Sequence, residues 1–147
     1  MMKSLVAAAA LVSLGACTSL EDKLGLNIPT FTATLAPGAG IASSGSGNAT
    51  MTLDTATLEL GYTVDYKDLS GPATMAHIHG PAEPGANAGV VVPLTVASST
   101  QLAGKVVLTE AQVAELKSGR YYVNIHTAAN KGGEIRGQIT QFIMFAN

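Results

Sequence analysis

The sequence predicts an all-β fold, a Greek-key antiparallel β-sandwich with one short connecting helix. Charged residues are only 12% of the chain, and the remainder is rich in small, hydroxylated and β-branched residues, which favours strands over surface helices. About seven or eight short segments alternate apolar and polar residues and are separated by turn sequences. Strands and helices do not alternate along the chain, so a sandwich is favoured over a parallel sheet.

Length and charge narrow the class further. A chain of 147 residues suits one domain with a single core. The formal net charge is −2, and no run of Lys and Arg is present. Because nucleic-acid binding depends on clustered positive charge, the composition argues against a nucleic-acid partner.

The N-terminal residues have the pattern of an export signal. Lys3 gives a positive start, and residues 5–14 form an apolar run of about ten residues, where a membrane-spanning helix needs about twenty. The next residues, Leu-Gly-Ala-Cys over 14–17, resemble the bacterial lipobox, which implies cleavage before Cys17 and lipid attachment to it. The alternative interpretation is an ordinary secretory signal followed by an incidental cysteine.

These features predict a signal peptide over residues 1–16, a lipidated cysteine and tether over 17–28, and a folded domain over 29–147. We therefore expect an exported protein anchored in the cell envelope by lipid on Cys17. An Asp directly after the cysteine would resemble an inner-membrane retention signal, but Thr18 stands there. In a cell with two membranes this favours an anchor in the outer membrane, on its periplasmic or surface face. Cys17 is the only cysteine, so no disulfide is expected.

The first half of the domain contains four segments with the two-residue period of half-buried strands. They are residues 31–35, 48–53, 58–66 and 74–79. The third segment is the clearest, because its alternate positions carry large apolar residues, namely Leu58, Leu60, Tyr62, Val64 and Tyr66. Residues 36–47 are rich in Gly, Ser and Ala and predict a loop.

The second half begins with an irregular segment, residues 80–89, which contains two prolines and three glycines. A strand over residues 90–96 follows, and Pro93 within it indicates an edge position or a bulge. Residues 105–108 predict a short extended segment. The last two strands are expected over 121–127 and 134–145.

One short helix is predicted between these strands, over residues 110–118. Thr109 and Gln112 have the spacing of a capping box, in which each side chain bonds the other's backbone N–H. Leu108 and Val113 occupy the positions of a hydrophobic staple, and Gly119 is placed to end the helix. We expect this helix to connect strands across one end of a sheet.

The three histidines of the chain lie in two of the predicted strands. His77 and His79 are two residues apart and share the face opposite Ile78. In the second strand Val123 and Ile125 have the character of core residues, so Asn124 and His126 are expected on the outward face. If the two strands are neighbours, the three imidazoles converge.

Three imidazoles with an open position suit a mononuclear metal, and copper or zinc fits an exported chain without thiolate ligands. His77, His79 and His126 are the candidate ligands, with Asn124, Glu134 and Arg136 as candidate supporting residues. The alternative is that each imidazole only hydrogen-bonds a nearby loop.

Glu134 and Arg136 are predicted on the face of the last strand opposite Ile135. We favour an Arg–carboxylate pair or a clamp of the guanidinium on a loop carbonyl. The alternative is an arginine that guides anions toward a metal. Neither a Ser–His–Asp pattern nor a readable carboxylate pair can be assigned, so an enzymatic function is not favoured.

These segments together resemble the CHRD domain, a module first described in chordin and found in many bacterial secreted proteins. The likeness is carried by residues 76–82, 90–94, 122–127 and 132–138, with 31–35 as the opening strand. It implies an extracytoplasmic β-sandwich, here of immunoglobulin-like or superoxide-dismutase-like type, and leaves the biochemical role open.

A second, weaker similarity is to copper/zinc superoxide dismutase. His77, His79, His126 and Arg136 follow the order of that family's copper histidines and arginine. Between His79 and His126 no bridging or zinc histidine is present, so a dismutase zinc site is excluded and a copper-only site is permitted.

Two functions from different classes follow. The first is a non-enzymatic, lipid-anchored binding module of the envelope whose partner is a protein or glycan. The second is a mononuclear copper- or zinc-binding protein with a redox or metal-handling role, using the three histidines.

Overall fold

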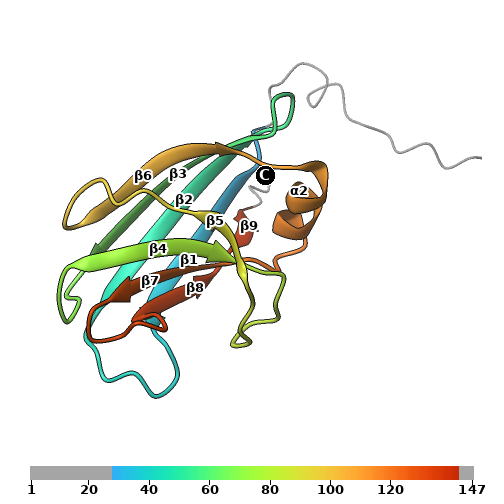
Figure 1. Cartoon of the computed structure of the whole chain (residues 1–147). Coiled ribbons are helices and arrows are strands. Elements are labelled where there is room, and N and C mark those ends of the chain that lie inside the picture. Colours follow the sequence, from blue (N-terminus) through green and yellow to red (C-terminus); the bar gives the residue numbers. More distant parts are fainter. Residues whose placement is uncertain (1–27, 143–147) are drawn as a thin grey trace, which may run out of the picture.

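The alternating segments form nine strands and one helix in the computed structural model, which describes residues 28–142 (Figure 1). The elements are β1 (Thr30–Pro37), β2 (Ser46–Asp54), β3 (Glu59–Lys67), β4 (Ala73–His79), β5 (Val90–Pro93), β6 (Gln101–Val107), α2 (Glu110–Lys117), β7 (Tyr122–Thr127), β8 (Ile135–Gln138) and β9 (Thr140–Phe142). The predicted signal peptide, Cys17 and nearly all of the predicted tether lie outside the described residues. In the described part of the chain no helix is long and apolar enough to cross a membrane.

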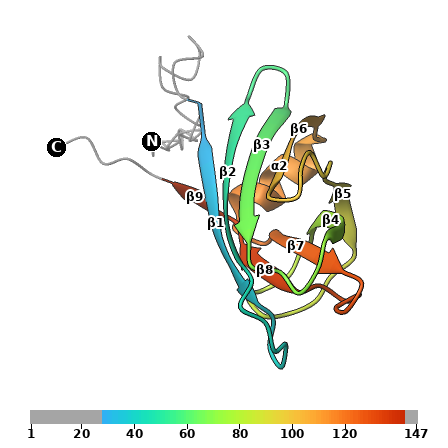
Figure 2. The ribbon, with the colours of Figure 1, turned by 90° about the vertical axis from the view of Figure 1, so that its left-hand side faces the viewer.

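The strands form two antiparallel layers that face each other (Figure 2). One layer has the order β9-β1-β2-β3-β6, and the other has the order β5-β4-β7-β8. Strand β1 joins them, because its last residues, Ala36 and Pro37, pair with β8 while the preceding residues pair with β2. Sequence neighbours such as β3 and β4 lie in different layers, as in a Greek-key arrangement. The predicted all-β sandwich is confirmed.

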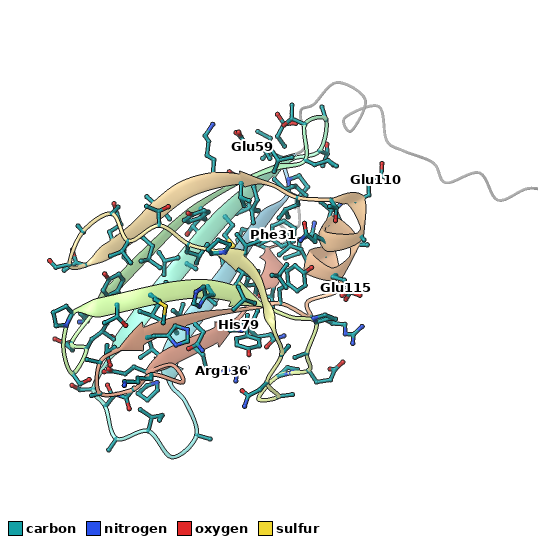
Figure 3. The ribbon with its side chains drawn as sticks, viewed as in Figure 1. Phe31, Glu59, His79, Glu110, Glu115 and Arg136 are labelled. Atoms are coloured by element: carbon teal, nitrogen blue, oxygen red, sulfur yellow. The ribbon has the colours of Figure 1, made fainter. Side chains whose placement is uncertain are left out.

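The core lies between the layers and is built from the apolar positions of the alternating segments. Residues no more than 1% exposed come from both sheets: Phe31, Met51, Leu60, Val64, Ile78, Val123, Ile125 and Ile135. Figure 3 shows Phe31 among these packed side chains. Burying each large apolar side chain contributes about 1.5–3 kcal/mol, so the inward faces of both sheets are strongly specified.

Strand β6 begins earlier than the short segment predicted at 105–108. It spans Gln101–Val107 because it pairs along most of β3, from Asp65 to Glu59. Gly104 obscured this pattern, since glycine weakens the strand signal. A side chain at Gly104 would collide with the ring of Tyr62, whose hydroxyl accepts a hydrogen bond from the backbone N–H of Thr95.

The strand predicted over 134–145 is divided within the described residues. The strand is interrupted at Ile139, which is fully buried and donates its N–H to the carbonyl of Tyr121. Residues before the break form β8 against β7, and residues after it form β9 against β1. The segment predicted at 90–96 ends at Pro93, and β5 pairs only with β4 among the described strands, which confirms its edge position.

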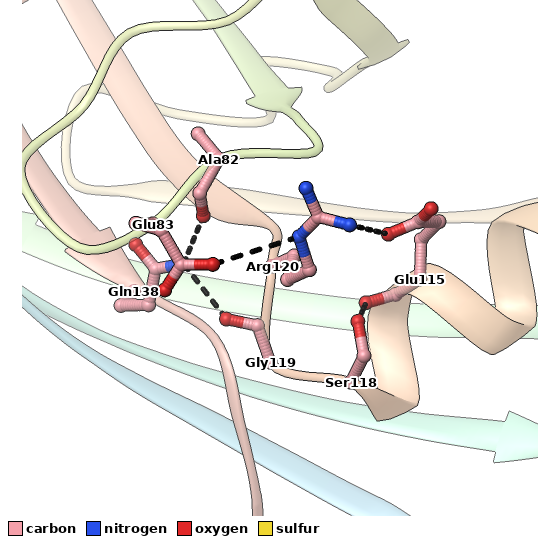
Figure 4. Close-up of polar contacts among 7 residues, drawn as sticks. All are labelled: Ala82, Glu83, Glu115, Ser118, Gly119, Arg120 and Gln138. Atoms are coloured by element: carbon pink, nitrogen blue, oxygen red, sulfur yellow. Dashed lines mark hydrogen bonds and ion pairs between the residues drawn. The ribbon is translucent and has the colours of Figure 1, made fainter.

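The helix is confirmed with its predicted caps. Thr109 and Gln112 form both bonds of the capping box, and Gly119 takes a φ of 74° after the last turn. Figure 4 shows the polar contacts that follow, in which Gln138 donates to the carbonyls of Ala82 and Gly119. These bonds tie the loop 80–89 and the helix end to β8.

Candidate metal centre

The histidines occupy outward positions on two adjacent strands of the second sheet. His77 and His79 lie on β4 and His126 lies on β7, which pairs directly with β4. Their sequence neighbours Ile78 and Ile125 are no more than 1% exposed and face the core. The two-residue period therefore places the three imidazoles on the opposite face, as predicted.

The three imidazole rings lie close together on this face. Ring centroids are separated by 5.5 Å for His77 and His79, 5.0 Å for His77 and His126, and 6.0 Å for His79 and His126. One nitrogen from each ring can be chosen so that all three atoms lie within 4.8 Å of one another. The convergence predicted from the sequence is confirmed.

Backbone carbonyls determine which nitrogen of two rings carries hydrogen. Nδ1 of His79 lies 3.0 Å from the carbonyl oxygen of Ala88, and Nδ1 of His126 lies 2.9 Å from that of Lys131. A carbonyl only accepts, so each Nδ1 donates, and in the neutral rings each Nε2 carries a lone pair. Histidine ligands of metals commonly donate their second nitrogen in this way.

His79 Nε2 is the one buried side-chain nitrogen or oxygen without a hydrogen-bond partner among the described residues. A buried polar atom left unpaired costs about 1–3 kcal/mol. A buried polar atom without a partner in a native structure calls for an explanation, and binding of an ion is one such explanation. The lone pair on Nε2 of His79 is thus buried and available to bind a metal ion.

The distance between His77 and His126 is also compatible with a shared ion. Nδ1 of His77 lies 3.1 Å from Nε2 of His126. Two nitrogens each about 2.0–2.1 Å from a metal and about 100° apart are separated by about 3.1 Å. Nitrogens that share one metal lie at most about 4.2 Å apart, which is close to the 4.8 Å within which all three nitrogens lie.

Burial favours the neutral form of His77 and His79. It lowers the pKa of His77 below its ordinary value of 6.5, and the nearby His126 and His79 lower it further. Burial also lowers the pKa of His79, against the opposing effect of its hydrogen bond to Ala88. Neutral imidazole is the form that binds metals, so the lowered pKa values of His77 and His79 favour binding.

Arg136 fastens the loop that carries the Ala88 carbonyl. Its guanidinium donates to the side-chain oxygen of Asn87 at 2.9 Å and to the carbonyl of Ala86 at 2.7 Å. It also lies 3.7 Å from the ring centre of Tyr122, whose hydroxyl accepts the N–H of Ala88. Figure 3 shows Arg136 and His79 near each other over the second sheet. Of the two favoured roles of Arg136, the clamp of its guanidinium on a loop carbonyl is the one that the structure contains.

The Arg–carboxylate pair does not form, because Glu134 is engaged elsewhere. Its fully buried carboxylate accepts from the hydroxyls of Ser43, Ser70 and Thr127, the backbone N–H of Ser70 and the amide of Asn130. Burial alone would raise the pKa of Glu134, but these hydrogen bonds lower it to about 2. Glu134 thus holds the loop 127–134 that carries the Lys131 carbonyl.

Asn124 supports the same loop from the strand side. It lies opposite His77 in the register, and its amide donates to the carbonyl of Gly132 at 3.1 Å. Asn124, Glu134 and Arg136 therefore contact the loops that orient His79 and His126, and none of their side-chain hydrogen bonds to the described residues reaches an imidazole. The alternative interpretation expected imidazoles bonded to nearby loops, and His79 and His126 make such bonds, although the sequence does not identify Ala88 and Lys131 as the acceptors.

A pocket of about 320 Å³ lies against Asn124 and Arg136, and none of the three histidines lines it. Its polar lining comes from Asn87, Asn124, Asn130, Glu134 and Arg136, and several glycines keep it open. Asn124 and Arg136 contribute both to this pocket and to the loops around the imidazoles.

Comparison with known proteins gives one match. The family model described as CHRD domain matches residues 31–139. No curated protein and no solved structure matches the chain. The matched region contains all three histidines and both loops that orient them.

Proposed function

We propose that this chain, which belongs to the CHRD domain family, is a lipid-anchored binding module of the cell envelope whose ligand is one copper ion. His77, His79 and His126 are the proposed ligands. The observation that supports this proposal most is the buried, unpartnered Nε2 of His79 beside two other convergent imidazole nitrogens.

The donor set favours copper over zinc. Affinities of nitrogen sites for divalent metals rise to copper and fall again at zinc, and neutral imidazole suits both ions. A carboxylate at the centre would favour harder ions, but Glu134, the only buried carboxylate in residues 28–142, is occupied by five hydrogen bonds. Binding or handling of copper follows, without an assigned catalytic step.

Metal analysis of the full-length protein, purified without a histidine tag, tests this proposal. We expect one copper per chain, lost in His79→Ala and in His126→Ala. Thr63→Ala on the exposed face of β3 is the matched control and should retain the metal. Absence of copper at micromolar metal in the folded wild-type protein would overturn the proposal.

The anchor is proposed from the residues 14–17 and has its own test. We expect the wild-type protein in the membrane fraction of a bacterial host and labelled by a fatty-acid analogue. Cys17→Ser should abolish the label. Labelling that persists in this variant would contradict lipid attachment at Cys17.

A second candidate function, recognition of a glycan or protein group, is favoured by the polar pocket of about 320 Å³. Three Asn side chains, Arg136 and Glu134 line it, which suits hydroxyl groups. Binding to an array of neutral and acidic glycans tests this candidate, with Asn130→Ala as the variant expected to lose it. An array without binders would remove the glycan alternative.

A further inference from the structure

Met75 is a large apolar side chain exposed beside the three histidines. Its exposed fraction is 51%, although it belongs to a strand whose neighbouring residues Ala76 and Ile78 are buried. It precedes His77 by two residues and so shares the outward face of β4. In the register of β4 and β7, Met75 lies directly opposite His126.

This placement brings the thioether within reach of the cluster. Side chains directly opposite each other on antiparallel strands have Cβ atoms about 4.5–5.5 Å apart. Methionine is unbranched and has three rotatable bonds, so its sulfur can turn toward or away from a neighbour. Met75 therefore lies next to two of the three proposed ligands, one along its own strand and one across the pair.

The pairing of the backbone is irregular just before Met75. The pairing of β4 with β7 shifts register between Ala73 and Met75. The hydroxyl of Thr74, within this irregularity, donates to the carbonyl of His126 at 3.2 Å. Bulges are common beside functional sites because they re-aim a side chain, and this one ends at Met75.

The other exposed large apolar residues carry no donor atom. They are Ile28, Val90, Val96, Val107 and Phe142. Met75 alone among them offers a soft ligand, and soft thioethers select Cu(I).

We propose that the sulfur of Met75 is a fourth ligand, which makes the centre a three-histidine, one-methionine site selective for Cu(I). The proposal rests on the proposed copper-binding function and adds the preferred oxidation state. All four donors are neutral, so binding Cu(I) leaves one positive charge in the site and binding a divalent ion leaves two. The buried position of His79 and His126 disfavours the larger charge.

Met75→Leu is the test, because it conserves volume and apolar character while removing the sulfur. The affinity of the full-length protein for Cu(I) is measured anaerobically by competition with a chromophoric chelator, and affinities for Cu(II) and Zn(II) are measured alongside. We expect Cu(I) affinity to fall by about tenfold or more in Met75→Leu, with the other two affinities nearly unchanged. Met51→Leu, the same substitution at a buried core position, is the matched control and should leave all three unchanged.

X-ray absorption of the Cu(I) form gives an independent result, with sulfur around the copper in wild type and none in Met75→Leu. Equal Cu(I) affinities in wild type and Met75→Leu, or a copper environment without sulfur, would overturn the fourth ligand alone. Failure of wild type to bind any of the three ions would instead overturn the proposed function on which it rests.

Discussion

Nδ1 of His77 lies 3.1 Å from Nε2 of His126, across the β4–β7 pair. The hydrogen bond from His126 Nδ1 to Lys131 leaves its Nε2 as an acceptor. When both rings are neutral and no metal is bound, Nδ1 of His77 therefore carries the hydrogen and donates it to Nε2 of His126. A metal bound to both atoms would require His77 to move its hydrogen to Nε2.

This exchange gives the first prediction. Titration with Ag(I), a diamagnetic substitute for Cu(I), should convert His77 from the Nδ1–H to the Nε2–H tautomer. His79 and His126 should remain Nδ1–H, because their backbone acceptors do not change. Nitrogen-15 chemical shifts of the three rings measure the tautomers. An Nε2–H form of His79 in the silver complex would contradict the assigned ligand atoms.

Arg136 should affect metal affinity without contacting the metal. Arg136→Lys keeps the charge but loses the planar guanidinium, whose two nitrogens bond Ala86 and Asn87 separately, so the loop that orients His79 loosens. We expect copper affinity to fall by about 10–100-fold, the range for residues that support metal ligands. Competition titration measures it, and circular dichroism verifies the fold.

The control for Arg136 is Arg120→Lys, whose bonds are made to the exposed residues Glu83 and Glu115 (Figure 4). Its copper affinity should equal that of wild type. A similar loss in both variants would indicate a general effect of arginine removal and not of the clamp.

Glu134 should make the stability of the domain depend on acidic pH. Its folded pKa of about 2 lies below the ordinary value of 4.5, so its contribution is complete above about pH 4.5 and is lost as the pH falls toward 2. Glu134→Gln should lower the free energy of unfolding at pH 7 by about 2–4 kcal/mol and flatten its dependence between pH 4.5 and 2.

Denaturant unfolding at several pH values measures this effect. Glu83→Gln is the control, because the Glu83 side chain is 80% exposed and should change stability little. An unaltered slope with pH in Glu134→Gln would assign the acid sensitivity to other groups.

Two adjacent glycines should respond differently to alanine. Gly133 has a φ of +117°, and a Cβ there would collide with the side-chain amide of Asn124, whereas a Cβ at Gly132 would meet nothing within 4 Å. Gly133→Ala should destabilise the domain by about 1–3 kcal/mol, while Gly132→Ala should stay within about 0.5 kcal/mol of wild type. Thermal melting distinguishes them, and equal melting temperatures would contradict the observed packing.

Ile125→Asp tests the assignment of inward and outward faces on β7. Ile125 is fully buried, so the variant places an unpaired charge in the core and should unfold the domain. Thr50→Asp, on the exposed face of β2, should melt close to wild type. An unchanged melting temperature of Ile125→Asp would mean that the faces are reversed.

Most strands were predictable because one face of each is buried, which imposes a two-residue period on the sequence. The failures have specific causes. Gly104 interrupts the signal of β6. Ile139 follows Ile135 and Gly137 at the two-residue spacing of one continuous strand, so nothing in the sequence marks the break between β8 and β9. The helix was predictable because its caps are local, and Thr109 and Gln112 need only each other.

The sequence by itself determined the all-β class, the capped helix, the common face of His77 and His79 and the outward direction of His126. These features depend on backbone periods of a few residues. Only the tertiary structure decided that β4 and β7 are neighbours, which brings His77 to His126 across 49 residues of chain. It also decided that the carbonyls of Ala88 and Lys131 orient two imidazoles and leave the Nε2 of His79 unpartnered. Strand partners and loop carbonyls are chosen by the packing of the whole core, which no local pattern encodes.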